Sequence, residues 1–176
     1  DFESALAMAS TSQALAPGFS TFSDARSEVK IATSGDFPQR SHTGPENQAL
    51  RLESNVKGWE GFVELFSNKS MKKCVPRDWS HLEGFSFWLY GNNSGVDMFV
   101  DILDNRHLCS TRDDAERYTY RFVDDVGGWR LVVVPFDDMA RKDIGNGAPN
   151  DGLGLTAVHG WGLGVLETGE PMVCFV

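Results

Sequence analysis

Four histidines and several acidic pairs are the residues in this sequence that could do catalytic chemistry. The histidines are scattered, and no HExxH zinc motif, GxSxG nucleophile turn or phosphate-binding loop accompanies them. A glycosidase needs two carboxylates that face one another across a cleft. The acidic residues here come as adjacent doublets, whose side chains point apart in strands and turns: Asp113-Asp114, Asp124-Asp125 and Asp137-Asp138. We therefore predict no catalysis and interpret the doublets as solvated turn residues, with Asp114 as the one candidate for a function.

Aromatic residues beside polar ones form the pattern that could bind a sugar. The C–H faces of sugars stack on aromatic rings, and their hydroxyls need donors and acceptors. Trp59 follows Gly58 in a polar stretch, so it is either a stacking residue or part of the core. His159 and Trp161 share one face of a predicted strand, and glycines occupy its other face, where a ligand or backbone can approach closely. Both ligand contact and a structural role fit His159 and Trp161.

The charge balance excludes one class of partner and the apolar pattern excludes another. The 176 residues include 16 Lys plus Arg against 25 Asp plus Glu, a formal net charge of -9. Nucleic-acid binding needs clustered cations, so we expect no nucleic-acid partner. No apolar run reaches the roughly 18 residues of a membrane span, so we expect no membrane partner either.

The three cysteines, Cys74, Cys109 and Cys174, cannot form a disulfide framework, because at most one bridge is possible. Buried or free thiols are the favoured interpretation, and a Cys74–Cys109 bridge is the alternative. No pair has the spacing of zinc ligands.

The elements that must position these residues are strands. Apolar and polar residues alternate with a period of two in runs bounded by Gly, Asn and Asp, which is typical of an antiparallel sandwich. Gly127-Gly128 separates two of these runs and predicts a hairpin between them. The Gly-, Asn- and Pro-rich segment 143–154 predicts a long loop. The predicted strands cover residues 62–66, 85–90, 98–103, 118–122, 131–134, 158–165 and 172–176.

The ends of the sequence indicate a module. The chain opens without Met or a signal peptide and closes on an alternating apolar run. We expect residues 1–176 to form a single domain that belongs to a longer polypeptide.

The order of several motifs along the chain resembles that of family eleven carbohydrate-binding modules, which have the galactose-binding-like jelly-roll fold. The motifs include Gly58 to Val63, Asp78-Trp79-Ser80, Glu116 to Tyr120, and Gly128-Trp129 through Pro135-Phe136. The stretch Gly147 to Leu153 is also similar to versions appended to family three glycoside hydrolases. The resemblance implies an all-β sandwich that binds β-glucan in a cleft on its concave sheet.

The resemblance also implies a set of ligand-binding residues. Trp59 matches a stacking Tyr of the family, Asp114 a cleft Asp, Arg141 and Asp143 a cleft Arg-x-Asp pair, and His159 a cleft His. This sequence departs from the pattern at Ile144, at Thr156-Ala157 and at Gly162, where the family has Tyr, Asp-Ser and Tyr. Trp161 is the candidate replacement for the last ring.

A structural calcium ion is expected near the start of the chain. Asp1 and Glu3 supply carboxylates, and the loop with Glu46 and Asn47 supplies further oxygens. Hard oxygen ligands from a strand and a turn suit Ca²⁺, and the related modules carry an ion here.

Three functions follow from these observations. The favoured one is a non-catalytic module that binds β-glucan and is attached to the catalytic domain of a secreted glycoside hydrolase, which implies an extracellular or periplasmic location. The alternative is a structural accessory domain that packs on its catalytic neighbour and shapes that active site, with little affinity for free glycan. A small glycosidase or lyase is the third and least favoured.

Overall fold

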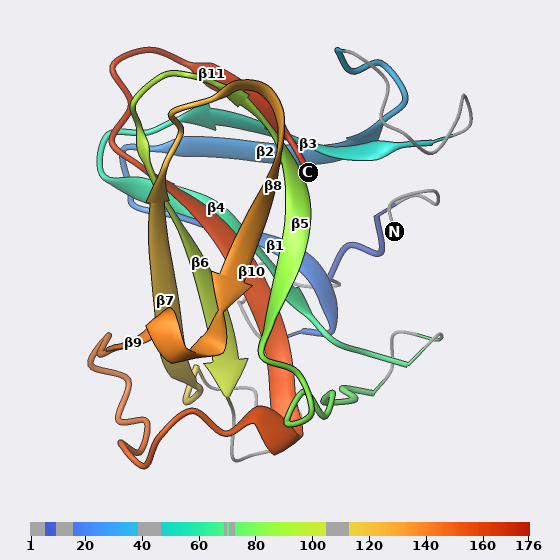
Figure 1. Ribbon diagram of the computed structural model, residues 1–176, viewed down its shortest axis with the longest axis vertical. Coiled ribbons are helices and arrows are strands. Elements are labelled where there is room, and N and C mark those ends of the chain that lie inside the picture. Colours follow the sequence, from blue (N-terminus) through green and yellow to red (C-terminus); the bar gives the residue numbers. More distant parts are fainter. Residues whose placement is uncertain (1–5, 10–15, 39–46, 69, 71–72, 105–112) are drawn as a thin grey trace.

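The computed structural model describes residues 6–9, 16–38, 47–68, 70, 73–104 and 113–176. These residues form two antiparallel sheets packed face to face, so the predicted all-β sandwich is confirmed (Figure 1). The strands are β1 (Gly18–Ser23), β2 (Glu28–Ser34), β3 (Ala49–Asn55), β4 (Trp59–Leu65), β5 (Gly84–Asn92), β6 (Asp97–Asp104), β7 (Glu116–Val123), β8 (Gly127–Pro135), β9 (Ala140–Lys142), β10 (Val158–Leu166) and β11 (Met172–Phe175). Two short 3-10 helices, η1 (Phe136–Asp138) and η2 (Leu155–Ala157), precede β9 and β10.

The chain crosses repeatedly between the two sheets. One sheet has six strands in the order β1-β4-β10-β6-β7-β9, and the other has five in the order β2-β3-β11-β5-β8. The hairpin predicted at Gly127-Gly128 is wrong, because β7 pairs with β6 and β8 pairs with β5 in the other sheet. This junction is a crossover between the two layers of the sandwich. The predicted loop at 143–154 contains no strand or helix.

The core fills the space between the sheets with one face of each strand. Leu50, Leu52, Phe62, Ile102 and Leu163 are among its buried side chains. Burying a side chain of this size contributes about 2 kcal/mol. The period-two alternation therefore assigns the other face of each strand to the outside of the sandwich.

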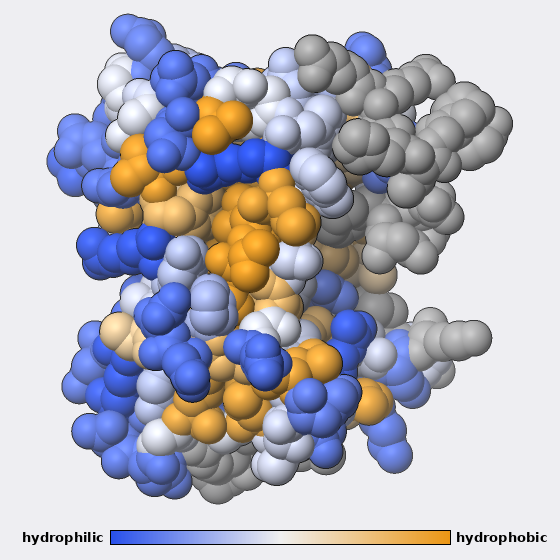
Figure 2. All heavy atoms as spheres, in the orientation of Figure 1, coloured by the Kyte–Doolittle hydropathy of each residue, from blue (hydrophilic) through white to orange (hydrophobic). Residues whose placement is uncertain are grey.

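The outer face of the five-stranded sheet carries an exposed apolar patch. Trp88, Leu131 and Val133 are 44%, 48% and 54% exposed, and Trp88 lies opposite Leu131 in the register of β5 and β8. Figure 2 shows apolar surface gathered in the middle of the face on which β5 and β8 lie in front. Among the described residues, no helix has the length and apolarity needed to cross a membrane.

Candidate ligand-binding groove

A groove lies on the outer face of the six-stranded sheet. Its volume of ≈ 560 Å³ falls within the range of small-ligand sites. All six strands contribute side chains, and β10, which contributes Leu166, also places Gly162 at the floor. The lining residues are Phe22, Trp59, Val63, Phe99, Asp101, Leu103, Asp113, Arg117, Thr119, Arg121, Lys142, Ile144, Gly162 and Leu166.

Glycines on the central strands make room for the rings that line the groove. A side chain at Gly164 of β10 would occupy the space of the Phe99 ring, and one at Gly61 of β4 would meet the Phe22 ring. The aromatic rings of the neighbouring strands pack directly against the backbone of these two glycines. The absence of a side chain is thus required by close packing at both positions.

The rings of Trp59, Phe22 and Phe99 form a row along one part of the groove. The centroids of Trp59 and Phe22 are 6.1 Å apart, and those of Phe22 and Phe99 are 6.3 Å apart. Trp59 is 47% exposed, so part of its ring is open to a ligand. We call these three residues the aromatic row.

Charged and polar side chains line the part of the groove beside β7 and β9. The Lys142 ammonium lies 2.7 Å from Asp101 Oδ2 and 4.1 Å from the centroid of the Phe99 ring. Arg117 donates two hydrogen bonds to Asp113, at 2.8 and 3.0 Å. Both acidic residues are therefore ion-paired, and their arrangement offers donors and acceptors to a polar ligand.

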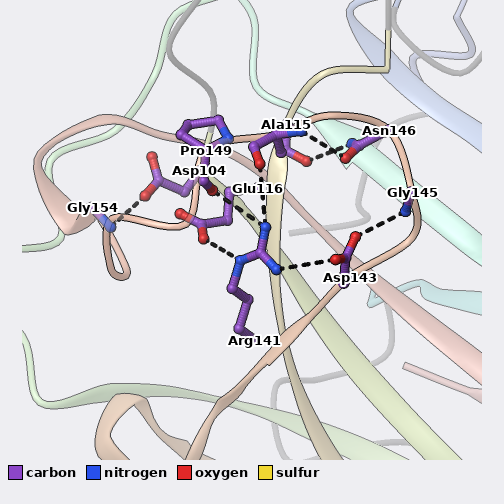
Figure 3. A network of polar contacts seen from close by, with 10 residues as sticks. Asp104, Ala115, Glu116, Arg141, Asp143, Gly145, Asn146, Pro149 and Gly154 are labelled. Carbon is purple, nitrogen blue, oxygen red and sulfur yellow. Dashed lines mark hydrogen bonds and ion pairs between the residues drawn. The ribbon is translucent and has the colours of Figure 1, made fainter.

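Arg141 and Asp143, which the resemblance assigned to the cleft, lie in a different network (Figure 3). Arg141 Nε donates to the fully buried Glu116 at 2.6 Å, and Nη2 donates to the carbonyls of Ala148 and Pro149. The bond to Glu116 raises the pKa of Arg141. The guanidinium thereby anchors the 143–154 loop, and its neighbour Lys142 is the β9 residue that reaches the groove.

Asp143 also serves the loop. Its carboxylate accepts the backbone N–H of Gly145 at 2.9 Å, and it lies 3.6 Å from Arg141 Nη1. The hydrogen bond from Gly145, followed by the charge of Arg141, lowers the pKa of Asp143. Neither Arg141 nor Asp143 is among the residues that line the groove.

His159 and Asp114 lie near one another, but neither is among the groove-lining residues. His159 sits at an irregularity in the pairing of β10 with β6, between Val158 and Gly160, and is buried. Burial lowers the pKa of His159, and the charge of Asp114 opposes that shift. The structure thus keeps His159 as a buried imidazole at the end of the sheet.

Trp161 points into the sandwich and not into the groove. Its ring packs edge-on against Phe62 at 5.3 Å and lies 6.0 and 5.7 Å from Phe85 and Phe87 of the other sheet. Its indole N–H donates to Glu64 Oε2 at 2.9 Å, which satisfies the polar end of the side chain inside the fold. The structure therefore gives Trp161 a core position, and the groove lies on the glycine face of the same strand.

Most of the expected calcium ligands cannot be placed. Asp1, Glu3 and Glu46 lie outside the described residues, and Asn47 alone of the four is described. In the part of the chain that the structure describes, no group of three or more His, Cys, Asp or Glu side chains could hold a metal ion. Cys74 and Cys174 are buried, Cys174 is a free thiol, and Cys109 lies outside the described residues.

Sequence reasoning found Trp59 but missed most of the groove. The missed residues include Phe22, Phe99, Asp101, Thr119 and Lys142, which follow from strand alternation and register once β10 is known to turn its glycines outward. The signal available in the sequence was the Gly160-x-Gly162-x-Gly164 repeat, which marks a face where neighbouring side chains come close.

Comparison with known proteins gives one family match and several similar structures. The profile of the carbohydrate binding domain (family 11) matches residues 1–163. The family 11 module of the cellulosomal cellulase Lic26A-Cel5E of Clostridium thermocellum is similar in fold, with a TM-score of 0.64 and 13% identity over 89% of this chain and 82% of that chain. No match is found among curated proteins.

Two further structures show the same fold. A family 11 module from Clostridium thermocellum, in complex with a β-1,3-1,4-mixed-linked tetrasaccharide, has a TM-score of 0.65 and 15% identity over 89% of this chain and 84% of that chain. A family 30 carbohydrate-binding module has a TM-score of 0.53 and 16% identity over 82% of this chain and 69% of that chain.

The profile match spans nearly the whole chain, and it confirms the resemblance inferred from the motifs. Modules of this family are non-catalytic, so the chain is not an enzyme. The chain belongs to family 11 of the carbohydrate-binding modules.

Proposed function

We propose that this chain binds β-glucan in the groove on its six-stranded sheet. The observation that carries the proposal is the aromatic row, with half-exposed Trp59 at one end and the Lys142–Asp101 pair close to Phe99. Sugar rings present C–H faces for such a row and hydroxyls for the polar residues beside it. The tetrasaccharide complex of the Clostridium thermocellum module supports a glucan as the ligand class.

The expected affinity is modest. A single aromatic contact contributes about 1 kcal/mol beyond the area it buries. We expect a dissociation constant on the order of tens of micromolar or weaker.

Replacing Trp59 with alanine tests this proposal. We expect binding of mixed-linkage β-glucan to weaken by about fivefold or more, measured by affinity electrophoresis and titration calorimetry. Trp88→Ala is the matched control, because Trp88 is exposed to a similar extent but lies on the other sheet. Equal affinities of the parent and Trp59→Ala would remove Trp59 from the site. Failure of the parent to bind any of a panel of soluble β-glucans would overturn the function itself.

We further propose that the module is attached to a secreted glycoside hydrolase and works outside the cell or in the periplasm. A module that binds a glucan keeps an attached hydrolase close to the polysaccharide that the hydrolase cleaves. The exposed patch of Trp88, Leu131 and Val133 favours a second candidate function, docking of the five-stranded sheet on the catalytic neighbour. Replacing Leu131 and Val133 by serine in the full-length protein tests it: a change in activity on a small soluble substrate would support docking, and unchanged activity would contradict it.

We also propose a structural calcium ion held by Asp1, Glu3, Glu46 and Asn47. The support is the chemistry of the donors, since carboxylate and amide oxygens are the ligands that Ca²⁺ prefers. The ion would join the start of the chain to the segment before β3 and thereby raise the stability of the fold.

A further inference from the structure

Asp101 is a groove residue with one satisfied and one unsatisfied oxygen. It is 6% exposed, and its Oδ2 is held by Lys142 at 2.7 Å. Its buried Oδ1 has no hydrogen-bond partner among the described residues. A buried acceptor without a donor is destabilising, and more so when the group is charged. The groove therefore contains an acceptor that a ligand hydroxyl can satisfy.

Thr119 places a second unsatisfied group beside this carboxylate. It lies directly opposite Asp101 in the register of β6 and β7, and both side chains line the groove. The buried Thr119 Oγ1 also lacks a hydrogen-bond partner among the residues that the structure describes. A hydroxyl can both donate and accept, whereas an ionised carboxylate only accepts. The two side chains thus offer one acceptor and one donor-acceptor at neighbouring positions.

The strand on the other side of Asp101 places no side chain over this pair. Gly162 lies opposite Asp101 on the other side, in the register of β10 and β6, and it has no side chain that could cover the carboxylate. Lys142 fixes the carboxylate from the direction of β9, and its ammonium rests over the Phe99 ring. Trp59 and Asp101 are two strand spacings apart across the sheet, and their partners on β10, Leu166 and Gly162, are four residues apart along the strand, so the two positions are about 16 Å apart. A glucan stacked on Trp59 therefore reaches Asp101 with one of its following sugar rings.

We infer that Asp101 and Thr119 form a hydroxyl-reading subsite for one neutral sugar unit, with Lys142 as the positioning residue; this inference rests on the proposed function. One sugar hydroxyl donates to Asp101 Oδ1, and the adjacent hydroxyl shares a hydrogen bond with Thr119 Oγ1. A sugar that lacks the donating hydroxyl leaves the carboxylate unsatisfied, and sites built to bind a hydroxyl discriminate strongly against such analogues. A uronate is disfavoured at this unit because its charge repels Asp101.

The test uses Asp101→Asn and Thr119→Val, which keep the shapes of the side chains, with Asp97→Asn on the same strand as a control outside the groove. The probes are a β-1,3-1,4-mixed-linked glucan tetrasaccharide and analogues that each lack one hydroxyl, measured by titration calorimetry. We expect the parent to bind one of the analogues at least tenfold more weakly than the tetrasaccharide. Asp101→Asn should bind the tetrasaccharide about tenfold more weakly and should not distinguish that analogue from it. Circular dichroism establishes that each variant is folded.

The outcomes separate this subsite from the proposed function. If the parent binds the tetrasaccharide and Trp59→Ala weakens it, but Asp101→Asn and Thr119→Val bind and discriminate as the parent does, the subsite is overturned and glucan binding stands. If Asp101→Asn does not fold, Thr119→Val alone decides, because an unchanged pattern across the analogues contradicts the subsite. A parent that binds no glucan overturns both.

Discussion

Replacing Glu60 with glutamine removes a titratable group that the fold buries completely. Glu60 lies on β4, on the face opposite to Trp59, and neither of its carboxylate oxygens forms a hydrogen bond within the part of the chain that the structure describes. Burial raises the pKa of Glu60 from the ordinary 4.5 to about 7, and nearby Ser54 and the backbone of Asn55 offset this shift only in part. Between pH 4.5 and about 7, Glu60 is therefore mostly protonated in the folded protein and mostly ionised in the unfolded chain.

The sign of the effect follows from that difference. A raised carboxyl pKa contributes stability that is fully present below about pH 4.5 and is lost as the pH rises through about 7. At 1.36 kcal/mol for each pKa unit, the shift corresponds to about 3 kcal/mol of unfolding free energy. His159 acts in the opposite direction: burial lowers its pKa, so its contribution is present above pH 6.5 and is lost on acidification. The difference between the parent and Glu60→Gln isolates Glu60, because both proteins retain His159.

Urea unfolding followed by tryptophan fluorescence at several pH values between 5 and 8.5 measures this difference. We expect the free energy of unfolding of the parent, relative to that of Glu60→Gln, to fall by about 2.5 kcal/mol between pH 5 and 8.5. Glu167→Gln, at an exposed position, is the control and should follow the parent. Parallel curves for the parent and Glu60→Gln would refute the reasoning, since the carboxyl would then titrate alike in both states.

Further predictions concern the loop, the core tryptophan, the ion and catalysis. Arg141→Met removes the guanidinium that pairs with the buried Glu116 carboxylate, and we expect a loss of about 3 kcal/mol of unfolding free energy in urea denaturation. Trp161→Ala should lower the melting temperature strongly, with a cost of about 3–5 kcal/mol typical of a truncated core aromatic, and a stable variant with weakened glucan binding would place the ring in the groove instead. Addition of EDTA should lower the melting temperature, and an unchanged value would show that no calcium site stabilises the chain. The pure chain should release no reducing sugar from β-glucans in long incubations, and release abolished by Asp114→Asn would contradict the assignment as a binding module.

The fold class could be predicted because alternation identifies strands without knowledge of their partners. Every predicted run coincides with a strand of the structure, to within one residue at Phe66 and at Val176, whereas β1, β2, β3 and β9 were missed. β2 did carry a signal, since Glu28 and Lys30 alternate with Val29 and Ile31. The pairing of the strands on either side of Gly127-Gly128 could not be predicted, because a pair of glycines is compatible both with a hairpin and with a crossover between sheets. Partner choice depends on packing of the whole sandwich, which a local pattern does not contain.

The groove was harder to predict than the fold, because alternation divides a strand into two faces without saying which one is inside. Trp161 and the glycines of β10 were separated correctly, yet the aromatic side belongs to the core and the glycine side to the groove. The neighbouring strands determine which face of β10 is inside. Glu64 of β4 accepts the hydrogen bond of the indole N–H within the fold, and the rings of Phe22 and Phe99 occupy the space that the glycines leave on the outer face. These are contacts between segments that are far apart in the sequence.

Arg141 and Lys142 show the same point at adjacent positions, since consecutive side chains of a strand point to opposite faces. The planar guanidinium of Arg141 can bond Glu116 and two loop carbonyls at once, so it suits the side where the 143–154 loop must be held. The flexible ammonium of Lys142 carries a compact charge, so it can both bond Asp101 and rest on the Phe99 ring in the groove. With lysine at position 141, a single ammonium group would hold the loop. With arginine at position 142, a rigid, planar guanidinium would occupy the groove. The β9 residue that reaches the groove is therefore Lys142, and Arg141 supports it by fixing the edge of the sheet from which Lys142 extends.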